Sequence, residues 1–291
     1  MLKNIEGNTS FVESYSNIGV FMDNKVVHLI DTGSNESLAA KLGNYLSENF
    51  PDHDFVVVHT HCHVDHLKGN SKLKNKLNAK FFAPKKELPL GMYPDFEGIY
   101  LFGAPVPKFL RVSFFSAKGV NMESLENLDS SISFHEMPGH SPGHTVFITP
   151  DGVVFTGDLV FQENVMQKYG YLYLMDVKEQ LESLEKAKKL GGDFFLPSHG
   201  RLMNREEFLK TVDENMEFIE KQIVLFYDIL KSPANIDEIT GKFLNIVNFQ
   251  GNEAMYFLAR SYVSAMVKYF YDRNVLSTEL TPKGLVFSVN D

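Results

Sequence analysis

The sequence predicts a mixed α/β fold followed by a mainly helical C-terminal region. Short apolar runs alternate with helical patterns up to about residue 203, and Phe55–Val58 has the β-branched composition of a buried strand. Beyond Arg201 the pattern changes to nearly continuous helix. We therefore expect an α/β domain over 1–203 and a helical region over 204–291 that resembles a winged helix.

Helix-capping residues, helix-breaking residues and the alternation of apolar and polar side chains predict the individual helices and strands of the α/β part. Residues 10–31 alternate apolar and polar side chains, as the strands of a meander do. Ser34 or Asn35 can cap a helix over 36–49. By the same criteria we expect later helices at 70–78 and 177–190, and later strands at 55–58, 80–83, 131–137, 145–149, 152–156 and 194–196.

The segment 84–120 contains five prolines among many aromatic residues. Proline interrupts both helices and sheets, so we expect neither a long helix nor a regular sheet here. A long irregular segment in a compact domain is typically a lid or a binding loop. The segment either covers the core or faces a substrate, and the candidates for the second role are Met92, Tyr93, Phe96, Tyr100 and Phe102.

The C-terminal region is expected to form helices at 204–230, 235–245 and 251–273 and a hairpin at 276–289. Nine basic and thirteen acidic side chains lie in 205–291, a balance that argues against reading DNA. Apolar side chains at helical spacing in the last helix predict core packing or the seam of a homodimer. They are Met255, Leu258, Tyr262, Met266 and Tyr269.

Composition excludes several classes of protein. The net charge of −9 argues against a broad nucleic-acid-binding surface. No apolar run approaches the roughly 20 residues that span a bilayer, and the N-terminus does not resemble a secretory signal, so we expect a cytoplasmic protein with no membrane partner. Cys62 is the only cysteine, which excludes an internal disulfide and gives no thiolate cluster for zinc.

Histidine and aspartate residues cluster at four places that can bind metal. Four of the ten histidines lie between positions 59 and 66, within the sequence His59-Thr60-His61-Cys62-His63-Val64-Asp65-His66. Imidazoles two residues apart on a tight loop can face one cation, and zinc accepts both imidazole nitrogen and carboxylate oxygen. Further ligand candidates are His140, Asp158 and His199, each next to glycine or proline and each at a turn or directly after an expected strand.

The motifs HxHxDH, GHSPGHT, TGD and PSHG, in this order, resemble those of the metallo-β-lactamase superfamily, nearest its glyoxalase II-like branch. Asp31-Thr32-Gly33 resembles the first motif of that family, and the resemblance covers roughly residues 8–200. It implies a four-layer αβ/βα sandwich with two divalent metal ions at one edge. Zinc suits the donors best, while iron or manganese fit them as well.

The resemblance also implies a role for each ligand candidate. His61, His63 and His140 would bind the first metal, Asp65, His66 and His199 the second, and Asp158 would bridge the two. A hydroxide between the metals would be the nucleophile, and Asp65 would additionally handle a proton for the leaving group. We expect Asp31 to orient a ligand by hydrogen bonding, and His59 and His144 to serve in packing or support.

Fold and metals do not fix the substrate. We expect hydrolysis of a small-molecule thioester or other carboxylic ester, with an apolar acyl group suiting the aromatic segment. The acidic C-terminal region argues against genuine glyoxalase II, which holds glutathione with basic residues there. A phosphodiester hydrolase and a regulatory or sensor protein that retains the metal site are the alternatives. One of Tyr169, Tyr171 and Tyr173 either lines the pocket or packs in the core.

Overall fold

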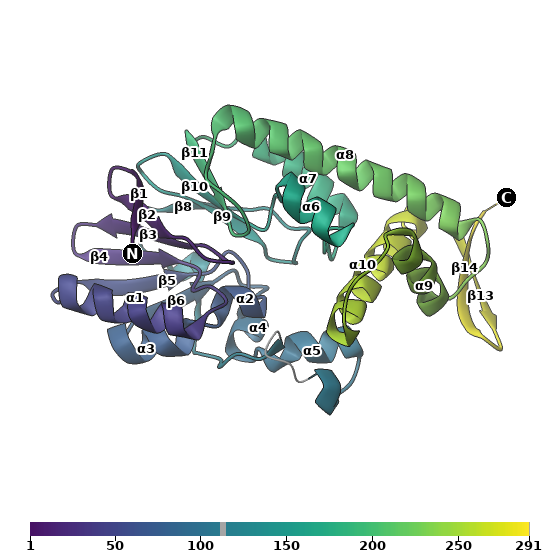
Figure 1. Cartoon of the computed structure of the whole chain (residues 1–291), viewed down its shortest axis with the longest axis horizontal. Coiled ribbons are helices and arrows are strands. Elements are labelled where there is room, and N and C mark those ends of the chain that lie inside the picture. Colours follow the sequence, from purple (N-terminus) through teal and green to yellow (C-terminus); the bar gives the residue numbers. More distant parts are fainter. Residues whose placement is uncertain (111–114, 291) are drawn as a thin grey trace.

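The computed structural model describes residues 1–110 and 115–290 and contains two facing β-sheets with helices on their outer sides (Figure 1). The first sheet has the order β1-β2-β3-β4-β5-β6-β7, antiparallel as far as β4 and parallel from β4 to β7. Its strands are β1 (Lys3–Glu6), β2 (Thr9–Val12), β3 (Ile18–Asp23), β4 (Val26–Ile30), β5 (Asp54–Val58), β6 (Lys80–Ala83) and β7 (Glu123–Ser124).

The second sheet has the order β12-β11-β10-β9-β8, with one parallel pair between β10 and β11. Its strands are β8 (Ser133–Glu136), β9 (Thr145–Ile148), β10 (Val153–Gly157), β11 (Phe194–Pro197) and β12 (Met203–Asn204). The expected αβ/βα sandwich is confirmed.

Side-chain alternation along the strands separates the layers of the core. The side chain of Val57 lies on the face of the first sheet that is turned away from the second sheet. It packs in one cluster with Leu42 of α1 (Glu36–Asn49) and Leu73 of α3 (Asn70–Leu77). Val58, the next residue, belongs to the cluster between the sheets together with Phe155 of β10. Each face of the first sheet is therefore buried, one against helices and the other against the second sheet.

The outer face of the second sheet packs against α7 (Val177–Ala187) and α8 (Arg205–Leu230). Phe195 of β11 stacks on Phe208 of α8 with ring centroids 3.9 Å apart and planes 5° from parallel. The same hydrophobic cluster continues into the C-terminal helices through Phe226 and Tyr262. A boundary at 203/204 and a winged-helix layout remain predictions.

The C-terminal region consists of the expected helices and hairpin. α8 extends past the second sheet and leads to α9 (Ile236–Ile246), α10 (Glu253–Tyr271), β13 (Leu276–Thr281) and β14 (Gly284–Val289). Figure 1 shows α10 extending between α5 (Asp95–Phe102) and the hairpin, and it contacts α5 and the short helix after it in the 84–120 segment. The C-terminal region thus reaches back toward the edge of the sandwich.

Several elements differ from the expectations. The segment 84–120 contains α4 (Leu88–Met92), α5 (Asp95–Phe102) and the short 3-10 helix η1 (Lys108–Leu110), and its residues 111–114 lie outside the described part. Its prolines are tolerated because Pro89 lies in the first turn of α4 and Pro94 precedes α5. The other elements that were not expected are β1, α2 (Val64–Leu67), β7, η3 (Leu125–Asn127), α6 (Glu163–Tyr169) and β12. The helix expected to end at 190 ends at Ala187.

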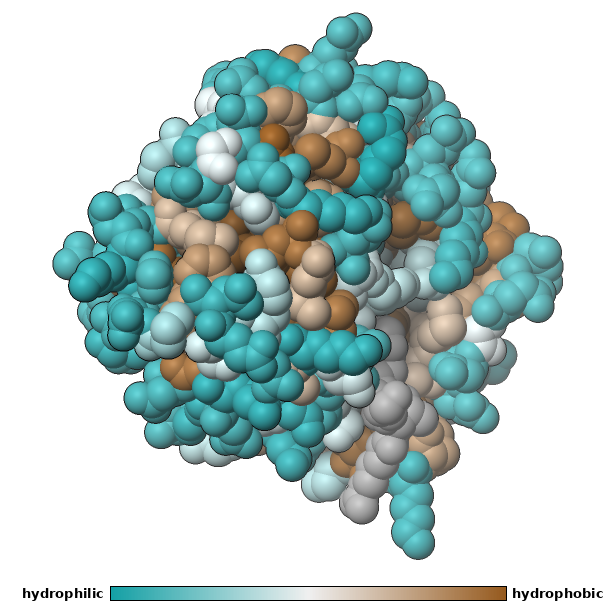
Figure 2. Space-filling view, turned by 60° about the vertical axis from the view of Figure 1, so that its left-hand side comes forward, coloured by the Kyte–Doolittle hydropathy of each residue, from teal (hydrophilic) through white to brown (hydrophobic). Residues whose placement is uncertain are grey.

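Among the described residues, no helix combines the length and apolarity needed to cross a bilayer. Figure 2 shows one face of the molecule, where hydrophilic side chains predominate and apolar ones emerge in small groups between them.

Candidate metal centre

The ligand candidates come from both sheets and meet at the edge where β5, β10 and β11 end. β5 is followed by the loop of His61 and His63, and this loop continues into α2. His140 lies in the turn between β8 and β9, Asp158 follows β10 and His199 follows β11. Because these strand ends adjoin at one edge of the sandwich, residues far apart in the sequence become neighbours.

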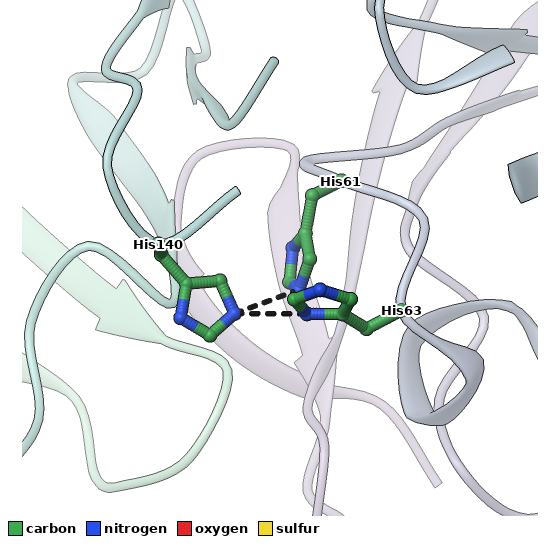
Figure 3. A group of neighbouring side chains, drawn as sticks. All are labelled: His61, His63 and His140. Carbon is green, nitrogen blue, oxygen red and sulfur yellow. Dashed lines mark hydrogen bonds between the residues drawn. The ribbon is translucent and has the colours of Figure 1, made fainter. Parts of the chain in front are cut away.

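His61, His63 and His140 form the first group (Figure 3). His140 Nε2 lies 3.0 Å from His63 Nδ1 and 3.2 Å from His61 Nε2, and all three residues are buried. Burial and neighbouring histidines lower the pKa of His63 to about 3. Burial likewise lowers the pKa of His140, to about 4, and that of His61 well below its usual value. At neutral pH these imidazoles are uncharged and offer lone pairs to a cation.

Asp65, His66 and His199 form the second group. His199 Nε2 lies 3.1 Å from Asp65 Oδ2, and His66 Nε2 lies 3.8 Å from Asp65 Oδ1. Burial alone would lower the pKa of His199, but the charges of Asp158 and Asp65 outweigh it and raise this pKa to about 10. The same carboxylates, with Asp31, raise the pKa of His66 well above its usual value, so the charges of the two histidines are balanced by Asp65 and Asp158 together.

Asp158 lies between the two groups. Its Oδ2 is 3.5 Å from His140 Nε2 and 3.4 Å from His199 Nε2, while its Oδ1 is 3.5 Å from His66 Nε2. The preceding Gly157 has φ +57°, and a Cβ there would lie 2.5 Å from His144 Nε2. Only glycine fits this turn, which brings the carboxylate to a position where it could serve both groups.

Further buried residues orient these side chains. Asp31, in the left-handed region at φ 60°, accepts a hydrogen bond from Thr60 Oγ1 at 2.7 Å and lies 3.0 Å from His66 Nδ1 and 3.3 Å from His59 Nδ1. His144 Nε2 accepts the backbone N–H of Asp158 at 2.9 Å. These contacts agree with the supporting roles expected for Asp31, His59 and His144.

The chemistry of the donor set fits divalent metal ions. Three overlapping groups have all their ligand atoms within 4.8 Å of one another, and one of them joins His61, His66 and Asp158 across the two groups. His66 Nε2 and Asp158 Oδ1 are buried and have no hydrogen-bond partner in the described part of the chain. Buried polar atoms without a partner are costly, and a cation between them would satisfy both.

The centre forms one end of a cavity of about 440 Å³. Its walls include Tyr169, Tyr171 and Tyr173, so all three tyrosines contribute to the pocket. Met255 and Leu258 of α10 also line it, as does Val165 of α6. The C-terminal region is therefore a wall of the pocket.

The expected aromatic contribution of 84–120 is not borne out for this cavity. Its described lining contains Glu97 of α5 but none of Met92, Tyr93, Phe96, Tyr100 and Phe102. Tyr93 and Phe96 instead stack on each other at the surface, with 60% and 46% of their areas exposed. Tyr100 lies behind the wall, with its hydroxyl 3.4 Å from that of Tyr173.

Two buried carboxylates near the loop of His61 and His63 were missed from the sequence. Glu97 Oε2 accepts the N–H of Val64 at 2.9 Å, and burial with the nearby charge of Asp65 raises the pKa of Glu97 to about 8. Glu87 Oε1 accepts hydrogen bonds from Ser141 Oγ and the N–H of Gly143, while its Oε2 accepts the N–H of Cys62. No motif marks them: Glu87 directly follows Lys85 and Lys86, and Glu97 lies two residues after Asp95.

The fold and the centre together define an αβ/βα-sandwich protein with a histidine- and aspartate-rich metal-binding site. The chain belongs to the metallo-β-lactamase superfamily, whose family model matches residues 12–199. The resemblance drawn from the motifs is thereby confirmed.

Relatives similar in sequence agree with this membership. Hydroxyacylglutathione hydrolase 1 of Vibrio vulnificus is 27% identical over 227 residues, 76% of this chain and 74% of that protein. A probable metallo-hydrolase of Bacillus subtilis is 25% identical over 195 residues, 65% of this chain and 83% of that protein. These relatives support a hydrolase.

Two crystal structures share the fold over nearly the whole chain, including the C-terminal region. A metallo-β-lactamase family protein from Thermus thermophilus superposes with a TM-score of 0.70 at 18% identity, covering 94% of both chains. A β-lactamase domain protein from Burkholderia ambifaria gives a TM-score of 0.73 at 16% identity, covering 99% of this chain and 93% of that one.

Proposed function

We propose that this protein is a hydrolase that uses two divalent metal ions to cleave a thioester or another carboxylic ester of a small molecule. The observation that carries the proposal is the convergence of seven ligand candidates at the end of a largely apolar cavity. The name of the Vibrio vulnificus relative, a hydroxyacylglutathione hydrolase, favours a thioester as the substrate.

The ligands are assigned as two triads joined by one carboxylate. His61, His63 and His140 would hold one ion, Asp65, His66 and His199 the other, and Asp158 would contact both. When bound, the two ions lower the pKa of a water molecule and polarise the carbonyl oxygen of the substrate. Zinc suits these donors, and iron or manganese would serve as well.

The remaining steps belong to side chains of the chain itself. Asp65 lies at the cavity with 20% of its side chain exposed, so it can accept a proton from the nucleophile and return it to the leaving group. Val165, Met255 and Leu258 would contact an apolar acyl group and exclude water from it. A cytoplasmic location, a homodimer and the absence of nucleic-acid partners remain predictions.

The metal assignment is tested first by elemental mass spectrometry on untagged protein purified without chelators. We expect about two ions per chain, according to the seven-ligand assignment. No metal, even after reconstitution with zinc, manganese or ferrous iron, would overturn the proposal.

The reaction is tested next with a panel of acyl thioesters, carboxylic esters and bis-p-nitrophenyl phosphate. We expect turnover of thioesters with apolar acyl groups. Turnover of the phosphodiester without turnover of the esters would instead assign the same centre to phosphodiester hydrolysis.

A further inference from the structure

The carboxylate of Glu87 lies between the two loops that carry the first group of ligand candidates. One loop contains His61 and His63 and follows β5 of the first sheet, and the other contains His140 and connects β8 with β9 of the second. Glu87 belongs to neither loop and precedes α4. It therefore contacts the two loops from a third segment of the chain.

Glu87 makes three hydrogen bonds, divided between the two loops. Its Oε2 accepts the backbone N–H of Cys62 at 3.2 Å. Its Oε1 accepts the hydroxyl of Ser141 at 2.8 Å and the backbone N–H of Gly143 at 2.7 Å. Cys62 separates His61 from His63, and Ser141 follows His140, so each bond is anchored within three residues of a ligand candidate.

The surroundings leave the carboxylate little freedom to move. Glu87 and Ser141 are fully buried, and a Cβ on Gly143 would lie 2.9 Å from Glu87 Cγ. Burial raises the pKa of Glu87, while the donors from Ser141, Gly143 and Cys62 oppose that rise. Accepting three hydrogen bonds is the pattern of an ionised carboxylate, which has no proton to donate.

Few other bonds connect these loops directly. One backbone bond, from Thr145 N to Thr60 O at 2.9 Å, joins their outer ends. Closer to the bonds that Glu87 accepts, His140 Nε2 lies 3.0 Å from His63 Nδ1 and 3.2 Å from His61 Nε2. The carboxylate is thus placed to fix the separation of the loops at the level of the ligands.

We propose that Glu87 is a positioning residue of the first group: its carboxylate holds the loop of His61 and His63 at ligating distance from the loop of His140. The inference rests on the proposed metal site but assigns Glu87 no contact with metal or substrate. Residues that orient metal ligands typically change metal affinity by about 10–100-fold when they are replaced.

The test uses Glu87→Gln and cobalt(II), an ion whose visible spectrum reports its ligands. Glutamine has nearly the same volume as glutamate. Its NH₂ group, however, must face at least one of the N–H or O–H groups that donate a hydrogen bond to the Glu87 carboxylate. To measure each group alone, the substitution is combined with His199→Ala, which disables the second group, and separately with His140→Ala, which disables the first.

With His199→Ala, we expect Glu87→Gln to weaken cobalt binding about 10–100-fold and to alter the visible bands. With His140→Ala, we expect no change in affinity. Glu136→Gln is the matched control, because Glu136 is an exposed glutamate on β8, and it should change neither. Unchanged affinity in both backgrounds, or equal weakening in both, would overturn the proposal.

A second variant covers the case in which Glu87→Gln does not fold. Ser141→Ala removes one of the three hydrogen bonds and leaves the carboxylate in place. It should weaken cobalt binding in the His199→Ala background by a smaller factor and with the same selectivity, and no weakening would contradict the inference. Failure of the wild-type chain to bind any metal would instead refute the proposed function.

Discussion

The two candidate ligand groups differ in charge and exposure although Asp158 adjoins both. The first consists of three buried imidazoles whose pKa values are lowered. The second contains Asp65 and His199, whose side chains are 20% and 12% exposed and lie 3.1 Å apart. The first group therefore presents unprotonated imidazole nitrogens to a cation. In the second, the charges of Asp65 and His199 compensate each other beside the cavity.

This difference implies that the two groups bind a cation with different affinity. A cation entering the first group displaces no proton near neutral pH, because His63 and His140 are already uncharged. A cation entering the second must displace the protons that Asp158 and Asp65 hold on His199 and His66. We therefore expect tighter binding in the first group and a more exchangeable ion in the second, next to the substrate.

Asp158→Ala should have the largest effect, because it removes the carboxylate between both groups. We expect the metal content to fall below two ions per chain and hydrolysis to fall on the order of 10³-fold, as when a main electrostatic contact of the transition state is lost. Elemental analysis and initial rates measure this. Asp193→Ala, at an exposed carboxylate, is the control. Full metal content with a rate within tenfold of wild type would exclude a bridging role.

A pH titration of metal affinity would sharpen the comparison between the groups. Between pH 5.5 and 8 the affinity of the second group should rise at least tenfold per pH unit, because His199, with a pKa of about 10, must lose its proton. The affinity of the first group should stay nearly constant, since His63 and His140 are neutral throughout this range. Calorimetry in buffers of different ionisation enthalpy counts the released protons. Equal slopes for both ions would remove the distinction.

The sequence alone was sufficient to predict the ligand candidates and the strands that precede them. His61, His63, Asp158 and His199 follow short apolar strands, and glycine or proline beside several candidates restricts the backbone to tight turns. Local patterns of this kind are visible without tertiary structure. All seven candidates accordingly meet within the three groups.

The parts that were missed depend on contacts between distant segments. In the sequence Glu87 and Glu97 look like surface carboxylates, but both are buried in the structure, beside α4 and within α5. Tyr93 and Phe96 were candidates for the pocket because they are aromatic, yet they lie on the exposed side of that segment. Periodicity does not reveal which face of a short, proline-flanked helix is covered.

Acid should destabilise the metal-free protein through the histidines with lowered pKa values. Their folded pKa lies below the unfolded value of 6.5, as for His63, His140 and His144 at about 3, 4 and 4. Their contribution is present above pH 6.5 and is lost as pH falls toward 4, because the unfolded chain binds more protons. We expect a loss on the order of 3 kcal/mol in unfolding free energy between pH 7 and 5.

Urea unfolding at the two pH values measures this loss. The raised pKa of His199 acts in the opposite sense, and only above pH 6.5, where its contribution declines toward pH 10. Metal-loaded protein is the control, since bound ions keep the imidazoles unprotonated and should reduce the loss. Equal unfolding free energies at pH 7 and 5 without metal would show that the first group is not held neutral by burial.

Met255→Ala should have the smallest effect and should separate substrate binding from metal binding. Met255 lines the cavity from α10 but belongs to neither ligand group. Shortening it removes apolar contact with an acyl group, so we expect KM to rise by about tenfold or less, with kcat and metal content unchanged. Tyr271→Ala, at the exposed end of the same helix, should leave KM unaltered. A fall in kcat or in metal content for Met255→Ala would mean that α10 supports the second group as well as the substrate.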